Sequence, residues 1–202
     1  NKGDIPMKFK IVADSASDML TLDGVPFTSV PLKINTSEKE YVDVASLDVD
    51  GMVADLLKYK GKSGTACPGP GEWIEAFEDA EYVFCVTITS NLSGSYNAAC
   101  VAKDEYEKAH PGRKVYIVDS LSAGSEMWLL VEKLRELIQA DLSFDEICQK
   151  IATYNQHTHM VFSLESIQNL ANNGRVNPAI AKIVGLLGIR IVGIAEDGLL
   201  AQ

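Results

Sequence analysis

One segment largely determines the architecture of this chain: Tyr82-Val-Phe-Cys-Val-Thr-Ile-Thr-Ser-Asn-Leu-Ser-Gly-Ser-Tyr96. Its first eight residues are apolar, aromatic or β-branched, which predicts a buried strand. The serines and the glycine that follow are typical of a turn at a helix start, where N–H groups, hydroxyls and the positive end of the helix dipole can bind an anion. Because the segment contains no Lys, Arg or His, it is suited to holding an anion rather than to attacking a substrate.

The composition indicates a folded protein that does not bind nucleic acid. Of the 202 residues, 47% are hydrophobic, which is enough for a sizeable core. The net charge of -10 repels phosphate backbones and anionic lipid surfaces. The four cysteines form no Cys-x-x-Cys pair, which favours a reducing compartment. The longest apolar stretch, 183–195, is interrupted by Arg190, so we expect a cytoplasmic protein without a membrane span.

Predicted strands and helices alternate through residue 154. The strands are expected at 9–13, 27–34, 82–89 and 114–118, and the helices at 48–59, 72–78, 95–110, 122–140 and 144–154. Ser143, with Glu146 three residues on, predicts a capping box for the last helix. Residues 61–71 are rich in glycine and proline, which predicts a connector without regular structure. The alternation predicts an α/β fold with a mainly parallel sheet flanked by helices.

Polar turns follow three of these predicted strands. They are Asp14-Ser15, Ser90-Asn91-Leu92-Ser93 and Asp119-Ser120. In open α/β sheets, ligands bind outside the carboxyl ends of the strands. If the three strands are neighbours, their turns therefore meet in one crevice.

The pattern changes after about residue 155. Strands are predicted at 160–164 and 189–194, a helix at 178–187, and turns at 172–175 and 196–198. A unit of this length rarely buries enough surface to be stable alone. We expect an N-terminal α/β domain over residues 1–156 and, over 157–202, the start of a second, smaller α/β domain that is incomplete in this sequence.

A catalytic function would depend on Asp14 or Ser93. A phosphatase could use Asp14 as its nucleophile, but Ala16 occupies the place of the second Asp, and an Asp-Ser pair at a strand end is also typical of a turn and cap. A hydrolase using Ser93 would need a Gly-x-Ser-x-Gly elbow and a His within reach, and the sequence has no such elbow. A small α/β hydrolase or phosphatase is the alternative function.

Two further candidates concern ligand binding. His157 and His159 could chelate a metal from one face of a strand, but no third ligand is placed near them, so we predict no metal site. For Ser93, anion binding and simple capping of the next helix are equally good explanations. The lack of a neighbouring cation favours a carboxylate over a phosphate, because doubly charged groups usually recruit cations.

Five segments, in their order along the chain, resemble the DegV family of bacterial fatty-acid-binding proteins. They are Val-Ala-Asp-Ser-Ala-Ser-Asp (12–18), Val-Pro-Leu (30–32) with Tyr-Val-Asp (41–43), Leu-Ser-Gly-Ser-Tyr (92–96), Val-Asp-Ser (118–120) and Asn-Gly-Arg-Val (173–176). No single segment is specific, but their ordered combination is, and it runs the whole length of the chain.

The resemblance implies two α/β domains that clamp one long-chain fatty acid, with its tail in an apolar tunnel and its carboxylate held by hydroxyls. It implies a protein that is not an enzyme and needs no cofactor. Such a protein presents the fatty acid to a separate fatty-acid kinase, which forms an acyl phosphate for phospholipid synthesis, and it allows transient membrane contact. By the matching motifs, the resemblance implies that Thr65, Ser93 and Gly94 bind the carboxylate. It places Arg175 near the pocket mouth or the partner surface.

Two departures from the family pattern concern the same site. The family's Thr-Ser-Gln-Pro-Ser loop stands here as Thr-Ala-Cys-Pro-Gly (65–69), which keeps the Thr and the Pro but removes two hydroxyls. A later His-containing motif, which contributes to carboxylate binding in the family, has no counterpart up to Gln202.

Overall fold

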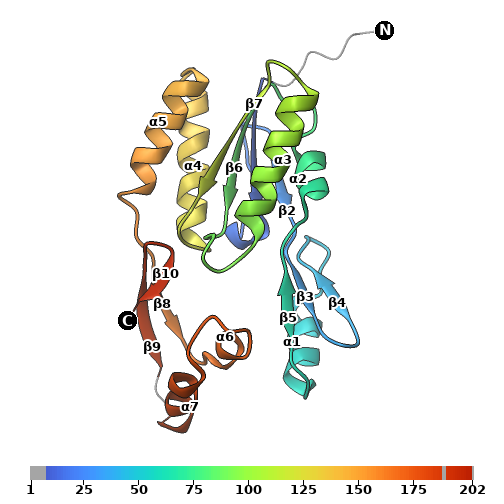
Figure 1. The fold of residues 1–202 in the computed structure, drawn as a ribbon, viewed down its shortest axis with the longest axis vertical. Coiled ribbons are helices and arrows are strands. Elements are labelled where there is room, and N and C mark those ends of the chain that lie inside the picture. The colour runs from blue at the N-terminus through green and yellow to red at the C-terminus, as the bar shows by residue number, and fades with distance from the viewer. Residues whose placement is uncertain (1–7, 188–189, 202) are drawn as a thin grey trace.

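A computed structural model describes residues 8–187 and 190–201, and its centre is a four-stranded sheet (Figure 1). The strands run parallel in the order β2-β1-β6-β7. They are β1 (Phe9–Asp14), β2 (Phe27–Val30), β6 (Tyr82–Thr87) and β7 (Lys114–Asp119). The predicted α/β fold with a parallel sheet flanked by helices is confirmed.

Both faces of this sheet are buried, because successive side chains of a strand point to opposite faces. Ile11 and Phe84 belong to the core formed with α4 and α5, whereas Val12 and Cys85 belong to the core formed with α2 and α3. Figure 1 shows the two helix pairs on opposite sides of the sheet. The helices are α2 (Pro70–Phe77), α3 (Ser95–Ala109), α4 (Ser125–Gln139) and α5 (Phe144–Asn155).

A small antiparallel sheet lies beyond the carboxyl end of the parallel one. Its order is β4-β3-β5, and it is formed by β3 (Lys33–Asn35), β4 (Glu40–Val42) and β5 (Gly64–Ala66). The helix α1 (Val49–Lys58) connects β4 to β5, and its N-cap Asp48 accepts a hydrogen bond from the Gly51 N–H at 3.0 Å. The chain between β2 and α2 is thus folded outside the parallel sheet.

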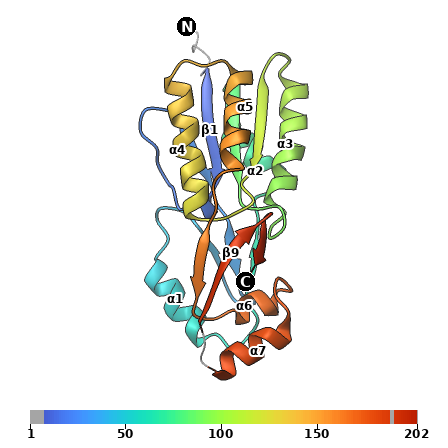
Figure 2. The ribbon, with the colours of Figure 1, turned by 90° about the vertical axis from the view of Figure 1, so that its left-hand side faces the viewer.

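A second antiparallel sheet is formed by the last described residues. Its order is β10-β9-β8, and the strands are β8 (Val161–Leu164), β9 (Ile191–Glu196) and β10 (Leu199–Ala201). The helices α6 (Gln168–Asn172) and α7 (Pro178–Leu187) lie between β8 and β9 in sequence. Both views place this unit at the same end of the molecule as α1 (Figures 1 and 2). No helix in the described part of the chain is long and apolar enough to cross a bilayer.

The expected elements are largely confirmed, and three expectations were wrong. The capping box of Ser143 and Glu146 forms, and α7 has the predicted bounds. The segment 27–34 is two strands in different sheets rather than one. The segment 61–71 is not wholly irregular, because it contains β5 and the start of α2. The last predicted strand is shifted to β9, and its predicted start at Ile189 lies outside the described residues. The domain division at residues 156 and 157 stays a prediction.

Candidate functional site

The three polar turns do meet at one edge of the parallel sheet. Because β1, β6 and β7 are adjacent, the residues that follow them lie side by side. Asp14, at the end of β1, accepts hydrogen bonds from the Ile88 N–H at 2.9 Å and the Ser95 hydroxyl at 2.6 Å. Asp119, at the end of β7, accepts one from the Ser90 N–H at 3.1 Å. Two carboxylates therefore hold the loop that follows β6 in place.

Asp14 is a fully buried carboxylate. Besides the two hydrogen bonds from the β6 side, it accepts one from the Ala16 N–H at 3.2 Å, so both of its oxygens are engaged. Burial, which disfavours the charged form, raises the pKa of Asp14 to about 6, and these three hydrogen bonds oppose the rise. The side chain supports the neighbouring loop, which agrees with the turn-and-cap interpretation.

Ser93 lies just before α3, where the N-cap position is taken by Gly94. The Ser93 hydroxyl oxygen accepts a hydrogen bond from the Ser95 N–H at 3.3 Å, so it caps the helix start only through this long contact. A hydroxyl also carries one proton to donate, and the first N–H groups of a helix have no partner within it. Ser93 and the start of α3 can therefore donate to the same anion.

Thr65 reaches the same place from the small antiparallel sheet. It is the middle residue of β5, pairs with Ile34 of β3 and is exposed. The loop that follows β5 packs against the start of α3, because a Cβ added at Gly94 would lie 3.3 Å from the Cys67 sulfur. The structure thus brings Thr65, Ser93 and Gly94 to one region, although the sequence separates Thr65 from the other two by 28 residues or more.

A cavity of about 470 Å³ opens beside these hydroxyls. Thr65, Ser93 and Arg175 line it together with a largely apolar wall, and its other polar lining residues are Lys33, Asp43, Asn169 and Asn173. The apolar residues of the wall come from the small sheet, α1, α6 and the loop after β6: Leu32, Ile34, Leu47, Val49, Met52, Ile88, Leu92 and Leu170. Apolar walls with a few convergent polar groups are typical of sites for small amphipathic ligands.

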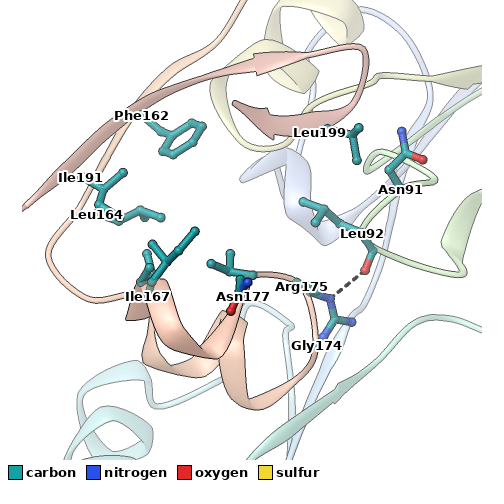
Figure 3. Close-up of a pocket in the computed structure, with 12 residues that line it drawn as sticks. Asn91, Leu92, Phe162, Leu164, Ile167, Gly174, Arg175, Asn177, Ile191 and Leu199 are labelled. Carbon is teal, nitrogen blue, oxygen red and sulfur yellow. Dashed lines mark hydrogen bonds between the residues drawn. The ribbon is translucent and has the colours of Figure 1, made fainter. Parts of the chain in front are cut away.

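Arg175 brings to this cavity a cation that the local sequence of the loop lacks. Its Nε donates to the Leu92 carbonyl oxygen at 2.9 Å, across 83 positions of sequence (Figure 3). Arg175 also lines a second cavity of about 540 Å³, whose wall includes Phe162, Leu164 and Ile191. Figure 3 shows Leu92 and Arg175 on one side of this second cavity and those three side chains on the other. Arg175 is therefore positioned at the boundary between the two cavities.

The histidines lie away from these groups. His110 and His157 each place Nδ1 within hydrogen-bonding distance of a carbonyl of their own helix, at 3.0 and 2.7 Å. No cluster of three or more His, Cys, Asp or Glu side chains suited to a metal occurs among residues 8–187 and 190–201. The sequence pattern did not predict β5 or α6, which also contribute to the cavity, because each is short and carries little local signal.

Comparison with known proteins places the chain in a family. The family model described as "Uncharacterised protein, DegV family" matches residues 8–202. A DegV domain-containing protein of Streptococcus pneumoniae is 45% identical over 195 residues, which cover 95% of this chain and 69% of that protein. A DegV domain-containing protein of Streptococcus gordonii is 44% identical over 193 residues, which cover 94% and 69%.

Solved structures give the same result. The Fatty Acid Kinase (Fak) B3 protein of Streptococcus pneumoniae, loaded with linoleic acid, is 45% identical with a TM-score of 0.93, and the match covers 96% of this chain and 71% of that one. A DegV family protein of Eubacterium eligens, loaded with heptadecanoic acid, is 43% identical with a TM-score of 0.92, over 96% and 70%. The sequence and the fold together show that this chain belongs to the DegV family.

Proposed function

We propose that this chain binds one long-chain fatty acid and presents its carboxylate to a fatty-acid kinase. The observation that carries the proposal is the cavity that Thr65 and Ser93 line together with an apolar wall. The two solved DegV structures at 43% and 45% identity, loaded with heptadecanoic and linoleic acid, support this ligand class. The chain acts as a binding protein without catalysis or a cofactor of its own.

The head of the ligand is held by neutral donors. Thr65 and Ser93 donate from their hydroxyls, while Gly94 allows a carboxylate to approach the N–H groups at the start of α3. A single negative charge suits this set, because hydrogen bonds from N–H groups and hydroxyls to an ionised acceptor are short and strong. Arg175 lies at the boundary of the cavity, where its exposed side chain can contact a partner or the mouth of the site.

The acyl tail supplies most of the affinity in this proposal. Burying a methylene contributes about 0.8 kcal/mol, so a long chain gains far more from the apolar wall than the head gains from two hydroxyls. The hydroxyls then fix which end of the ligand faces the kinase. The wall that the described residues provide contains branched aliphatic and Met side chains, which suit a flexible hydrocarbon.

Different observations support the proposed kinase partner and the proposed cellular location. The Fak B3 protein is named after a fatty-acid kinase, and this chain shares its fold with a TM-score of 0.93. The four cysteines Cys67, Cys85, Cys100 and Cys148 are all free, which fits a reducing cytoplasm. A cytoplasmic carrier of this kind would acquire its fatty acid through transient contact with a membrane.

The alternative, a hydrolase or phosphatase using Asp14 or Ser93, has less support from the geometry. Asp14 is fully buried and uses both oxygens in hydrogen bonds to the protein, so it presents no exposed carboxylate to a substrate. Ser93 has no general base among its hydrogen-bond partners in the described residues, because its hydroxyl contact is the Ser95 N–H.

Mass spectrometry of an organic extract of the purified protein tests the proposal. We expect a long-chain fatty acid in about equimolar amount, and Ser93→Ala should lower its retention. Ser90→Ala is the matched control, because it removes a hydroxyl from the same loop without altering the cavity wall. Absence of any fatty acid, together with no thermal stabilisation by added linoleic acid, would contradict the proposal, and turnover of ester or phosphate substrates would favour the alternative.

A further inference from the structure

The turn of the β9–β10 hairpin is bonded to the loop that carries Ser93. The buried Thr89 hydroxyl donates to the Gly198 carbonyl oxygen at 3.0 Å, and the Asn91 Nδ2 donates to the Asp197 carbonyl oxygen at 3.0 Å. These contacts span more than 100 positions of sequence. Figure 3 shows Leu199, next to this turn, facing Asn91. The hairpin therefore directly contacts the loop of residues 88–94 between β6 and α3, here called the head-group loop.

Thr89 is also the residue that shapes the loop itself. Its carbonyl oxygen accepts hydrogen bonds from the Leu92 N–H at 3.1 Å and the Ser93 N–H at 3.3 Å. Its own N–H donates to the Ser122 carbonyl oxygen at 2.9 Å, and its hydroxyl oxygen accepts from the Asn91 N–H at 3.3 Å. A displacement of Thr89 would be passed to Ser93 through these bonds.

The contact favours glycine at position 198. The φ of Gly198 is +77°, a conformation that favours glycine. A Cβ at this position would lie 2.5 Å from the Thr89 hydroxyl oxygen and 2.7 Å from the Asn91 Nδ2. Any side chain at Gly198 would therefore push directly on both donors of the loop. By contrast Gly112, with a φ of +98°, has no atom within 4 Å of such a Cβ.

We propose that Thr89, Asn91 and Gly198 are positioning residues for the head group, and that the hairpin turn holds the Ser93 loop in its ligand-binding geometry. This inference rests on the proposed function. The hairpin comes from the second part of the chain, whereas Ser93 comes from the first. The contact thus makes head-group binding depend on how these two parts are docked.

The test compares linoleic acid binding by Thr89→Val, which removes the donor but keeps the shape, with Thr89→Ser, which keeps the hydroxyl. We expect Thr89→Val to raise the dissociation constant about twofold to tenfold, the range for losing one neutral hydrogen bond, and Thr89→Ser to restore most of the loss. Asn91→Ala is a second variant, because its exposed side chain can be removed without disturbing the core. It should weaken binding in the same direction.

A glycine pair separates positioning from general stability. Gly198→Ala and Gly112→Ala both impose a positive φ on alanine, but only the first collides with the head-group loop. Both should lower the melting temperature of the empty protein, whereas only Gly198→Ala should reduce the extra stabilisation produced by linoleic acid. Equal ligand-induced stabilisation in both glycine variants and in Thr89→Val would overturn the positioning role. If the wild-type protein itself gains no stabilisation from linoleic acid, the proposed function fails, and the positioning role fails with it.

Discussion

Asp14→Asn should change how the stability of the protein depends on pH. The wild-type carboxyl has a pKa of about 6 in the folded state against its ordinary value of 3.8, because it is buried. A carboxyl whose pKa is raised in the folded state contributes stability that is fully present below its unfolded-state pKa, about 3.8. This stability is lost as the pH rises through the folded-state pKa, about 6. The wild-type protein should therefore lose stability from this group between pH 4 and pH 7.

The size of the effect follows from the shift. A tenfold change in a protonation equilibrium corresponds to about 1.4 kcal/mol, so the rise of the pKa from 3.8 to about 6 corresponds to a loss of about 2 to 3 kcal/mol across this range. Asn cannot titrate, so Asp14→Asn removes this loss. It also weakens one hydrogen bond, since an amide has one accepting oxygen, and the longest contact, from the Ala16 N–H at 3.2 Å, is the least costly to lose.

The assay is urea unfolding of both proteins at intervals from pH 4 to pH 7. Other carboxylates titrate in both proteins and cancel in the difference, which isolates Asp14. The free energy of unfolding of Asp14→Asn, minus that of the wild type, should rise by about 2 to 3 kcal/mol with increasing pH. A difference that is flat, or that falls with pH, would refute the inference that the buried carboxyl is destabilised by its charge.

Two further predictions concern the hydrogen bond from Ser95 to Asp14 and the ion pair between Lys10 and Glu78. Ser95→Ala removes the 2.6 Å hydrogen bond that lowers the pKa of Asp14, so the pH-dependent loss of stability should move to higher pH in the same urea titration; an unchanged profile would show that the bond contributes nothing. Glu78→Gln should destabilise the protein by roughly 1 to 3 kcal/mol, the cost of leaving a buried donor without its partner, because Lys10 is 2% exposed and its Nζ lies 2.9 Å from the Glu78 carboxylate. Lys10→Met, which removes the buried charge itself, should cost less than Glu78→Gln in the same denaturation assay, and the reverse order would contradict this account.

The parallel sheet could be predicted from the sequence because its strands carry strong local signals. The strand β6 is a continuous apolar run, and the capping box of Ser143 and Glu146 sets the start of α5 within four residues. The turns after β1, β6 and β7 could be predicted to meet, because adjacent parallel strands end at the same edge. These inferences need only the pattern of neighbouring residues.

The small sheet could not be predicted in the same way. Its strand β5, Gly64–Ala66, has three residues without an alternating pattern and forms by pairing with β3, about 30 positions earlier. Pro31 separates β2 from β3, and the next residue, Leu32, donates its N–H to the Ser15 hydroxyl at 3.0 Å rather than to a sheet partner. Pro31 is itself a local signal for this break, whereas the pairing of β3 with β5 depends on contacts between distant positions that the local sequence does not encode.

The candidate site was predictable only in part. The strand–turn–helix pattern predicts an anion-binding role for Ser93 and Gly94, whereas the role of Thr65 was predicted from the resemblance to the DegV family. The contact of Arg175 with the Leu92 carbonyl spans 83 positions, and that of Thr89 with Gly198 spans 109. The local sequence predicts neither contact, because each depends on how the segment that contains Arg175 and Gly198 packs against the loop after β6.

A crystal structure of the protein grown with linoleic acid would show where the carboxylate of the ligand binds. We predict that the carboxylate lies within about 2.5 to 3.0 Å of the hydroxyl oxygens of both Thr65 and Ser93, the range for an O–H group donating to oxygen. The acyl tail should lie along the apolar wall of the 470 Å³ cavity that Thr65 and Ser93 line. A carboxylate bound away from both hydroxyls, for example on the far side of Arg175, would contradict the account.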